Sequence, residues 1–215
     1  MTDRPEGILD ALLALRVKTP RLELRIPESG AWSVFAAEIA GRVVPAESAH
    51  FVGSWAQLVP PESEEAFVAA RERTLGACTR KRWGIELGAF DRSRLVGQAS
   101  LYARDWSASR EVITASLVHP EHRGRGLGTE MRSGVLALAF TVLGADVAWS
   151  GASFDNVASN RVSEKLGYEH LGEQAKRTGG GEMRFTRLRL TAQAWRPDPA
   201  IVVTAGADAV RAALR

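Results

Sequence analysis

The sequence predicts one domain of the α/β (α+β) class, built on a mixed β-sheet with helices around it. Three observations carry this prediction. The chain has 215 residues, and a single domain usually holds about 100–200. Hydrophobic residues make up 45% and charged residues 25%, as in ordinary globular proteins. The hydrophobic pattern switches between the strand period and the helix period in an order typical of a mixed sheet flanked by helices.

The first half of the chain predicts one strand and several helices. A short helical pattern over 1–17 precedes a strand at 19–27, where apolar and charged side chains alternate between two prolines. Helices are expected at 28–40 and 64–75, the second one after a pair of prolines. The stretch 41–59 between them shows no clear pattern.

The second half is richer in strands. Strands are expected at 82–90, 95–103 and 110–118, followed by a polar stretch at 119–128, a helix at 129–143, a strand at 146–152 and a helix at 156–166 that Gly167 stops. A hairpin of 167–175 and 183–190 surrounds a triple-glycine loop at 179–181. We divide the chain into a main domain, 1–195, and a C-terminal extension, 196–215, with a short strand and a short helix.

Composition excludes several classes of protein. No apolar run approaches the ~20 residues that span a bilayer. The first ten residues carry acids and a proline, whereas a secretory signal needs a basic start and an apolar core. Cys78 is the only cysteine, which excludes an intrachain disulfide and a cysteine-based zinc site. A cytoplasmic protein without a membrane partner is therefore expected.

The small positive charge carries little information about a partner. Basic residues outnumber acidic ones by 28 to 25, which gives a net charge of +3. Arginines greatly outnumber lysines, but they are scattered, with neither a long basic run nor interleaved aromatic residues. No nucleic-acid partner is expected.

The strongest local signal is the stretch His119–Thr129, HPEHRGRGLGT, which joins a predicted strand to a predicted helix. Its glycines at 124, 126 and 128 let the backbone approach a ligand closely. Unpaired amides at the helix start, together with the helix dipole, attract an anion. Arg123 and Arg125 add positive charge beside them, so we expect this loop to bind a pyrophosphate.

Three phosphate-binding patterns compete for this loop. The P-loop requires a lysine, and this loop has none. The dinucleotide fingerprint requires GxGxxG in a βαβ unit, whereas the glycines here are spaced GxGxG after strands with an antiparallel pattern. The third pattern, [Gln/Arg]-x-x-Gly-x-[Gly/Ala], is met by Arg123, Gly126 and Gly128. A glycine-rich turn without a ligand is the remaining alternative.

Two further segments agree with the third pattern. RGRGLG at 123–128 resembles the coenzyme A pyrophosphate loop of the GNAT superfamily of acyl-CoA-dependent N-acyltransferases. DNVASNRVSEKLGY at 155–168 is similar to the family's Asn-x-x-[Ala/Ser] helix, which ends in Gly-[Phe/Tyr]. The opening strand TPRLELR, at 19–25, and the serine three residues after the asparagine resemble the branch of ribosomal-protein N-terminal (alanine/serine) acetyltransferases. The resemblance covers roughly residues 18–195.

The resemblance implies where an acyl-CoA cosubstrate would bind. The strands at 110–118 and 146–152 would splay apart, with pantetheine between them. Backbone groups of Leu117 and Val118 would pair with pantetheine, and one amide would polarise the thioester carbonyl. Asn156 would cap the second helix and contact coenzyme A or the splayed strand. The pyrophosphate would lie on Arg123, Gly124, Arg125, Gly126, Leu127, Gly128 and Thr129. The expected cosubstrate is acetyl-CoA or another short acyl-CoA, and no metal is expected.

The chemistry requires a neutral amine, a polarised carbonyl and a proton for the departing thiolate. Ser159 resembles the family's proton donor to the thiolate. Glu111, on a strand beside the expected gap, is the candidate general base. The alternatives are Glu86 in an earlier strand, Glu182 beside the triple-glycine loop, a water relay and an amine that deprotonates unaided. We expect the histidines at 119 and 122 at the surface and the tyrosine at 168 in the core.

The sequence therefore predicts an acyl-CoA-dependent N-acyltransferase. The acceptor is a primary amine: a protein N-terminus, a lysine or a small amine. Succinyl-CoA is the alternative donor, and a non-catalytic coenzyme A-binding regulator is the alternative function. The acceptor pocket is expected between 28–75 and 82–106, where tryptophans occur at 32, 55, 83 and 106, most of them favoured as core residues. The tail could pack on a partner subunit, and a homo-oligomer is expected.

Overall fold

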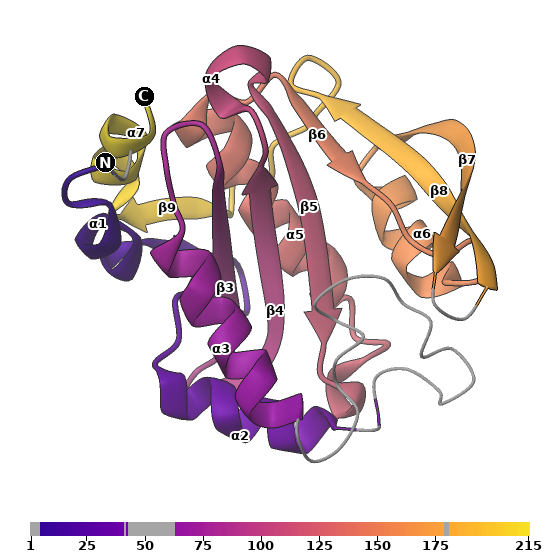
Figure 1. Ribbon diagram of the computed structural model, residues 1–215, viewed down its shortest axis with the longest axis horizontal. Helices are drawn as coiled ribbons and strands as arrows, with labels where there is room; N and C mark the ends of the chain where they lie inside the picture. The colour runs from indigo at the N-terminus through magenta and orange to yellow at the C-terminus, as the bar shows by residue number, and fades with distance from the viewer. Residues whose placement is uncertain (1–4, 41, 43–62, 179–180) are drawn as a thin grey trace.

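A computed structural model describes residues 5–40, 42, 63–178 and 181–215. Trp55 and two of the glycines at 179–181 lie outside the described residues. One nine-stranded sheet, in the order β7-β8-β6-β5-β4-β3-β2-β1-β9, forms the centre of the fold (Figure 1). The strands are β1 (Arg16–Lys18), β2 (Glu23–Arg25), β3 (Trp83–Asp91), β4 (Arg94–Ala103), β5 (Glu111–Val118), β6 (Val147–Ser150), β7 (Glu169–Thr178), β8 (Gly181–Thr191) and β9 (Val202–Ala205).

Seven helices surround the sheet in the described part of the chain: α1 (Ile8–Ala14), α2 (Ser29–Ile39), α3 (Ser63–Gly76), α4 (Trp106–Ser109), α5 (Leu127–Ala137), α6 (Val157–Lys165) and α7 (Ala207–Leu214). A 3₁₀ turn spans Pro120–His122, and a π-helical segment, Leu138–Leu143, extends α5. In the described residues we find no helix with the length and apolar character needed to cross a membrane.

The predicted strand at 19–27 is wrong in extent. The chain forms two short antiparallel strands there, β1 and β2. A tight turn separates them: Thr19 donates its amide to the carbonyl of Leu22 at 2.9 Å, and the Thr19 hydroxyl accepts from the Leu22 amide at 3.0 Å. Pro20 lies inside this turn and cannot donate to a ladder, so the alternating pattern is interrupted.

Helices cover both faces of the sheet, with α2 and α3 on one face and α5 and α6 on the other (Figure 1). Two glycines permit the close approach. A β-carbon on Gly84 would come within 2.4 Å of Thr74 in α3, and one on Gly97 within 2.7 Å of the Met131 sulfur in α5. A small apolar core therefore lies under α2 and α3, and a larger one lies under α5.

The sheet divides between β5 and β6, the one parallel pair among the described strands. The other pairings of these strands are antiparallel, which confirms the predicted mixed sheet. The β5–β6 register runs only from Glu111 opposite Val147 to Ile113 opposite Trp149. Beyond Ile113, β5 continues to pair with β4, while β6 pairs with β8 and leans away (Figure 1). We call the region between 114–118 of β5 and the end of β6 the fork.

The C-terminal tail packs on its own chain. β9 pairs with β1, with Val203 opposite Val17, and forms one edge of the sheet. In α7, Val210 is 0% and Leu214 is 2% exposed, and both belong to the larger core. The sequence analysis allowed this tail to pack on a partner subunit. In the structure it has buried contacts within its own chain.

Removing residues 196–215 is expected to destabilise the protein by several kcal/mol. Burying a Val or Leu side chain contributes about 1.5–3 kcal/mol, and β1 also loses its outer partner. Thermal denaturation of a chain that ends at Trp195 tests this expectation and the proposed division at that residue. Val202, which is 51% exposed in β9, supplies the control, since Val202→Ala should change stability by less than about 0.5 kcal/mol. Equal melting of the shortened and full chains would contradict the expectation.

Candidate functional site

The glycine-rich loop between β5 and α5 presents an open helix start. Gly124 and Gly126 adopt φ values of 75° and 78°, which favour glycine. Gly126 is the N-cap of α5 and has no side-chain cap, and the first intrahelical bond in that turn runs from Glu130 to Gly126. The amides of residues 127–129 precede that bond, so they are available to an anion at the positive end of the helix.

An ion pair from the start of the chain braces this loop. Arg21 donates to the carbonyl oxygen of Arg125 at 2.8 Å and to the carboxylate of Glu130 in α5 at 2.6 Å. Thr19 also donates to that carboxylate, at 2.6 Å. Sequence reasoning missed this contact, because the partners lie about a hundred residues apart. The charged and polar residues before β2 were the only local signal.

The two predicted loop arginines are exposed, and they differ in their surroundings. Arg125 Nη1 lies 3.1 Å from His122 Nδ1. Partial burial lowers the pKa of Arg123. Both side chains stand on the segment that leads into the open helix start, as predicted from the sequence.

His119 is buried, so the prediction of a surface position is wrong for this residue. The side chain is 1% exposed and packs against Phe35 of α2. Its Nδ1 accepts from the Glu121 amide at 3.3 Å, which caps the turn leading into the loop, and its Nε2 lies 3.4 Å from the Glu38 carboxylate. Burial lowers the pKa of His119. The last residue before the loop is thus anchored under α2.

The free edge of β5 offers backbone groups to the fork. His119 donates its amide to Val96 of β4 at 2.9 Å. Because amides alternate in direction along an antiparallel strand, those of Ser116 and Val118 turn toward the fork. The amide of Leu117 turns to β4, and its side chain joins the core under α2. Of the two residues predicted to pair with pantetheine, Val118 has its backbone at the open edge, and Ser116 shares that edge.

Helix α6 begins beside the fork with the predicted cap. Asn156 Oδ1 accepts from the Ser159 amide at 3.1 Å, so this side chain is an N-cap. Ser159 is half-buried in the first turn. Asn160 donates to the carbonyls of Ser153 and Phe154 and accepts from Thr186, which ties the start of α6 to the loop after β6. The structure thereby fixes Ser159 in position.

Two residues at the root of the fork lie on the α5 face. Tyr168 is 7% exposed and lies in the core, as predicted, and its hydroxyl is 2.8 Å from that of Thr114. Thr114 also donates to the carbonyl of Trp149 at 3.2 Å, which links β5 to β6 where their ladder ends. Sequence reasoning also missed Arg132 of α5, which contacts both strands beyond this point.

Glu111 lies at the closed end of the fork, on the opposite face of the sheet. It stands across from Val147, and its Oε2 accepts from the indole of Trp149 at 2.9 Å. Residues 111 and 117 share a face because side chains alternate along a strand, so Glu111 lies on the side covered by α2 and α3. The predicted base is thus fixed near the root of the fork.

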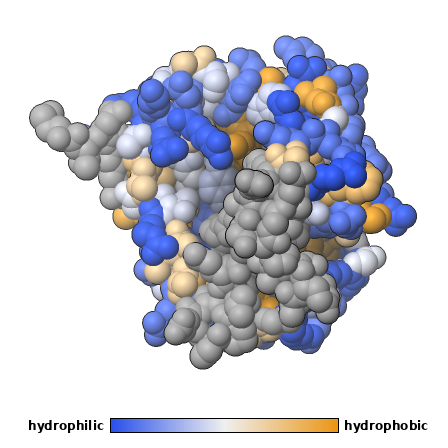
Figure 2. All heavy atoms as spheres, turned by 45° about the vertical axis from the view of Figure 1, so that its right-hand side comes forward, coloured by the Kyte–Doolittle hydropathy of each residue, from blue (hydrophilic) through white to orange (hydrophobic). Residues whose placement is uncertain are grey.

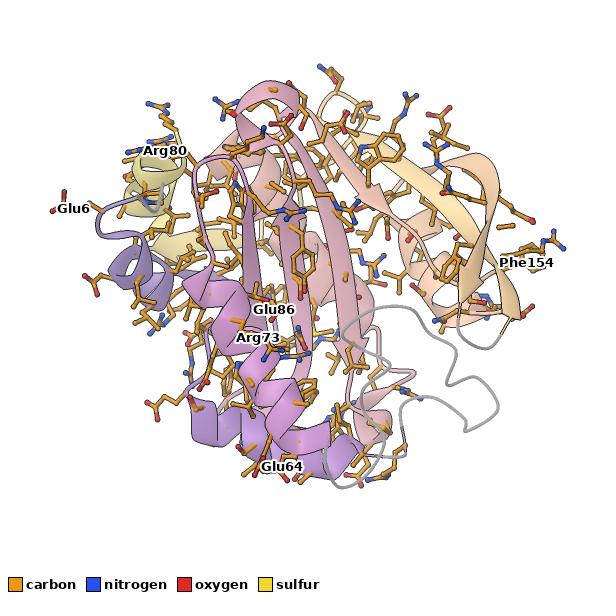
Figure 3. The ribbon with its side chains drawn as sticks, in the orientation of Figure 1. Glu6, Glu64, Arg73, Arg80, Glu86 and Phe154 are labelled. Carbon is orange, nitrogen blue, oxygen red and sulfur yellow. The ribbon has the colours of Figure 1, made fainter. Side chains whose placement is uncertain are left out.

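Glu86 of β3 lies beside α3 (Figure 3) and belongs to a buried polar cluster with residues of α3 and β4. Tyr102 donates to Glu86 Oε1, and Arg71 Nε lies 3.9 Å from Glu86 Oε2. Arg71 also donates to Gln98 at 2.7 Å. Burial raises the pKa of Glu86 and lowers that of Arg71 to about 10. Tyr102 pairs with Ile113 of β5, so the cluster reaches the strand next to the fork.

The described tryptophans of the predicted acceptor region are core residues. Trp32, Trp83 and Trp106 are 3%, 3% and 1% exposed. Phe154 and Val157, before and at the start of α6, are instead 49% and 56% exposed. Among the residues coloured by hydropathy in Figure 2, hydrophilic ones predominate, with small apolar patches between them.

Comparisons with known proteins agree with this geometry. A family model described as an acetyltransferase (GNAT) domain matches residues 21–169. The N-acetyltransferase YoaA of Bacillus subtilis, described as uncharacterised, is 33% identical over 42% of this chain and 50% of its own length. The human alpha/beta-tubulin-N-acetyltransferase 9 is 28% identical over 51% of this chain and 56% of its own length. The chain thus spans about half the length of the curated relatives it matches.

Solved structures share the fold at low sequence identity. A probable acetyltransferase has a TM-score of 0.68 at 19% identity and covers 84% of this chain and 98% of its own. RimL, a ribosomal L7/L12 alpha-N-protein acetyltransferase solved with coenzyme A, has a TM-score of 0.67 at 15% identity, covering 82% and 97%. A dodecameric spermidine N-acetyltransferase from Vibrio cholerae has a TM-score of 0.61 at 17% identity, covering 80% and 95%.

Proposed function

The chain belongs to the acetyltransferase (GNAT) family, and from this premise we propose that it transfers a short acyl group from coenzyme A to a primary amine. The observation that carries the proposal is the position of the open helix start of α5, immediately after the free edge of β5. A pyrophosphate on the amides of 127–129 places the attached pantetheine arm beside Val118. The arm then completes the sheet where β6 has turned away.

The proposed reaction is a direct attack on the thioester. The amine nitrogen bonds to the acyl carbon, the carbon–sulfur bond breaks, and its electron pair leaves with sulfur. A backbone amide at the fork edge, that of Val118 or Ser116, polarises the acyl oxygen. Ser159 supplies the proton to sulfur, and Glu111 receives a proton from the attacking amine. The products are an amide and free coenzyme A.

One further carboxylate is a second candidate for the base. The observation that favours Glu86 is its place in the buried cluster next to β5, where burial raises its pKa. Glu111 lies on β5 itself, two residues before the last β5–β6 pair, and is our first choice.

Donor and acceptor are proposed by class. The donor is acetyl-CoA or another short acyl-CoA, with succinyl-CoA as the alternative. The acceptor is a protein N-terminus, a lysine or a small amine, in keeping with the names of the relatives, which include a protein-N-terminal and a spermidine acetyltransferase. We further propose a homo-oligomer and a cytoplasmic location. The exposed edges of the sheet, β7 and β9, are the surfaces to test for contacts between copies.

Gly126→Ala is expected to weaken coenzyme A binding about tenfold. An L-residue held at this positive φ costs about 1–2 kcal/mol. The loop without ligand relieves this strain by shifting its amides away from the anion position. Restoring them on binding costs affinity, and about 1.4 kcal/mol corresponds to a tenfold change. Gly144→Ala is the matched control: Gly144 has φ 73° and no atom within 4 Å of an added β-carbon, and it lies at the far end of the helix. Equal affinities of the two variants would contradict this role for the loop.

The test of the proposed function is calorimetric titration with acetyl-CoA, succinyl-CoA and free coenzyme A, followed by thiol release with a panel of amines. We expect binding of all three ligands through the shared pyrophosphate, and thiol release with one acyl donor and at least one class of amine. Binding without thiol release from either donor would indicate that the protein is a non-catalytic coenzyme A-binding regulator. No binding of any of the three would overturn the proposal.

A further inference from the structure

Arg132 of α5 is a buried cation at the fork. Its side chain is 2% exposed. Nη1 donates to the hydroxyls of Ser150 at 3.0 Å and Ser163 at 2.9 Å, and Nη2 donates to that of Ser116 at 2.9 Å. One guanidinium therefore joins β5, β6 and α6 from below the sheet.

The charge of this guanidinium is not neutralised by an acid. Within the described part of the chain, no carboxylate forms an ion pair with Arg132, and its Nε has no hydrogen-bond partner. Tyr168 is the titratable group that faces it, and burial raises the pKa of that phenol, so Tyr168 stays neutral. Burial lowers the pKa of Arg132, but arginine remains protonated in proteins. A buried cation without a counter-ion is unfavourable for folding, so its presence here points to a function.

The position of Arg132 is where the two strands separate. The last β5–β6 pair is Ile113 with Trp149, and the Thr114 hydroxyl makes the last direct link. Ser116 and Ser150 lie just beyond that point, one on each strand. Arg132 bridges their hydroxyls from the α5 face, and this links the two strands beyond their last ladder pair.

The same guanidinium is connected to the predicted proton donor. Ser163 receives a hydrogen bond from Arg132 and donates its own proton to the carbonyl oxygen of Ser159 at 3.3 Å. The first turn of α6 is thereby held relative to both strands. Glu111 lies on the other face of the sheet, so its negative charge does not enter this cluster.

We propose that Arg132 is a positioning residue whose unneutralised charge is kept at the fork for the thiolate of coenzyme A. This inference rests on the proposed function. When the carbon–sulfur bond breaks, negative charge develops on sulfur, and pantetheine bound along β5 puts that sulfur in the fork. A fixed cation in a water-poor interior favours an anion more strongly than one in solvent does. The serine hydroxyls that hold it accept hydrogen bonds from Nη1 and Nη2 without cancelling its charge.

The test is the titration of the thiol of coenzyme A bound to the intact protein, followed by the ultraviolet absorbance of the thiolate. A nearby opposite charge lowers the pKa of such a group by about 1–3 units. We expect the thiol to ionise at least about one unit below free coenzyme A in the wild-type complex. Arg132→Gln should return it close to the free value, and Arg132→Lys, which keeps the charge, should retain most of the shift.

Arg211→Gln is the control with the same loss of charge. Arg211 lies in α7, paired with Asp208 at the surface, so the thiol should titrate as in the wild type. A role in packing alone would lower the melting temperature of both Arg132 variants and leave the thiol pKa unchanged, which would overturn the inference. So would equal behaviour of the Lys and Gln variants.

If Arg132→Gln fails to fold, titration of the bound thiol in the wild type and in Arg132→Lys still tests the inference. A wild-type complex whose thiol titrates at or above the free value refutes the role of Arg132 and leaves the proposed function standing. A wild-type protein that does not bind coenzyme A refutes the proposed function itself.

Discussion

Ser159→Ala is expected to lower kcat about 100-fold and to leave KM for the acyl-CoA nearly unchanged. The hydroxyl is proposed to act on sulfur only as the thiolate leaves, and removing one donor to a developing charge typically costs about 100-fold or more. That factor corresponds to about 2.7 kcal/mol of transition-state stabilisation. The fold should tolerate the change, because Asn156 caps α6 through the backbone amide of residue 159, which alanine retains. Steady-state thiol release measures both constants.

The control for Ser159 is Ser159→Thr, which keeps a hydroxyl at the same place. We expect it to retain most of the activity. A variant Ser159→Ala with wild-type kcat would show that sulfur leaves without this donor, and Ser159 would then be only a residue of the first turn of α6.

Glu111→Gln is expected to lower kcat/KM about 100-fold at neutral pH, because a general base typically contributes about 10²–10⁴. The glutamine amide oxygen can still accept from Trp149, so the side chain keeps its position while losing its ability to take a proton. Trp149→Phe is the matched control, since it removes the hydrogen bond and keeps the carboxylate.

Glu86→Gln separates the two carboxylates. A base acts in its ionised form, so activity that depends on Glu86 is lost as the pH falls through a folded-state pKa raised above 4.5 by burial. If Glu86→Gln no longer shows this fall in activity at low pH while Glu111→Gln stays active, the general base is Glu86 of the buried cluster under α3. If both variants keep wild-type activity, the amine is deprotonated without help from either residue.

The features that could be predicted from the sequence depend on residues close together in the chain. The GxGxG pattern indicates the positive φ values of the glycines at 124 and 126. Asn156 is predicted to cap a helix because it precedes an amphipathic stretch that ends at a glycine. The free edge of β5 was expected from a family resemblance, and the register of β6 accounts for it physically.

The features that could not be predicted join distant segments. Arg21 and Glu130 meet across more than a hundred residues, and no local pattern pairs them. His119 is buried because α2 covers it, which its polar neighbours in sequence do not reveal. Arg132 lies on the apolar stripe of its helix, one turn before Val135, and that periodicity could have marked it as buried. Its serine partners come from three separate elements, so its role needed the fold.

The central claim is that acyl transfer takes place in the fork between β5 and β6, and a crystal structure of the protein with coenzyme A tests it most directly. We predict pyrophosphate oxygens on the amides of 127–129, pantetheine paired with the backbone of Val118, and sulfur between the two strands beside Ser159. Coenzyme A bound elsewhere on the protein, with the edge of β5 left unoccupied, would contradict the account.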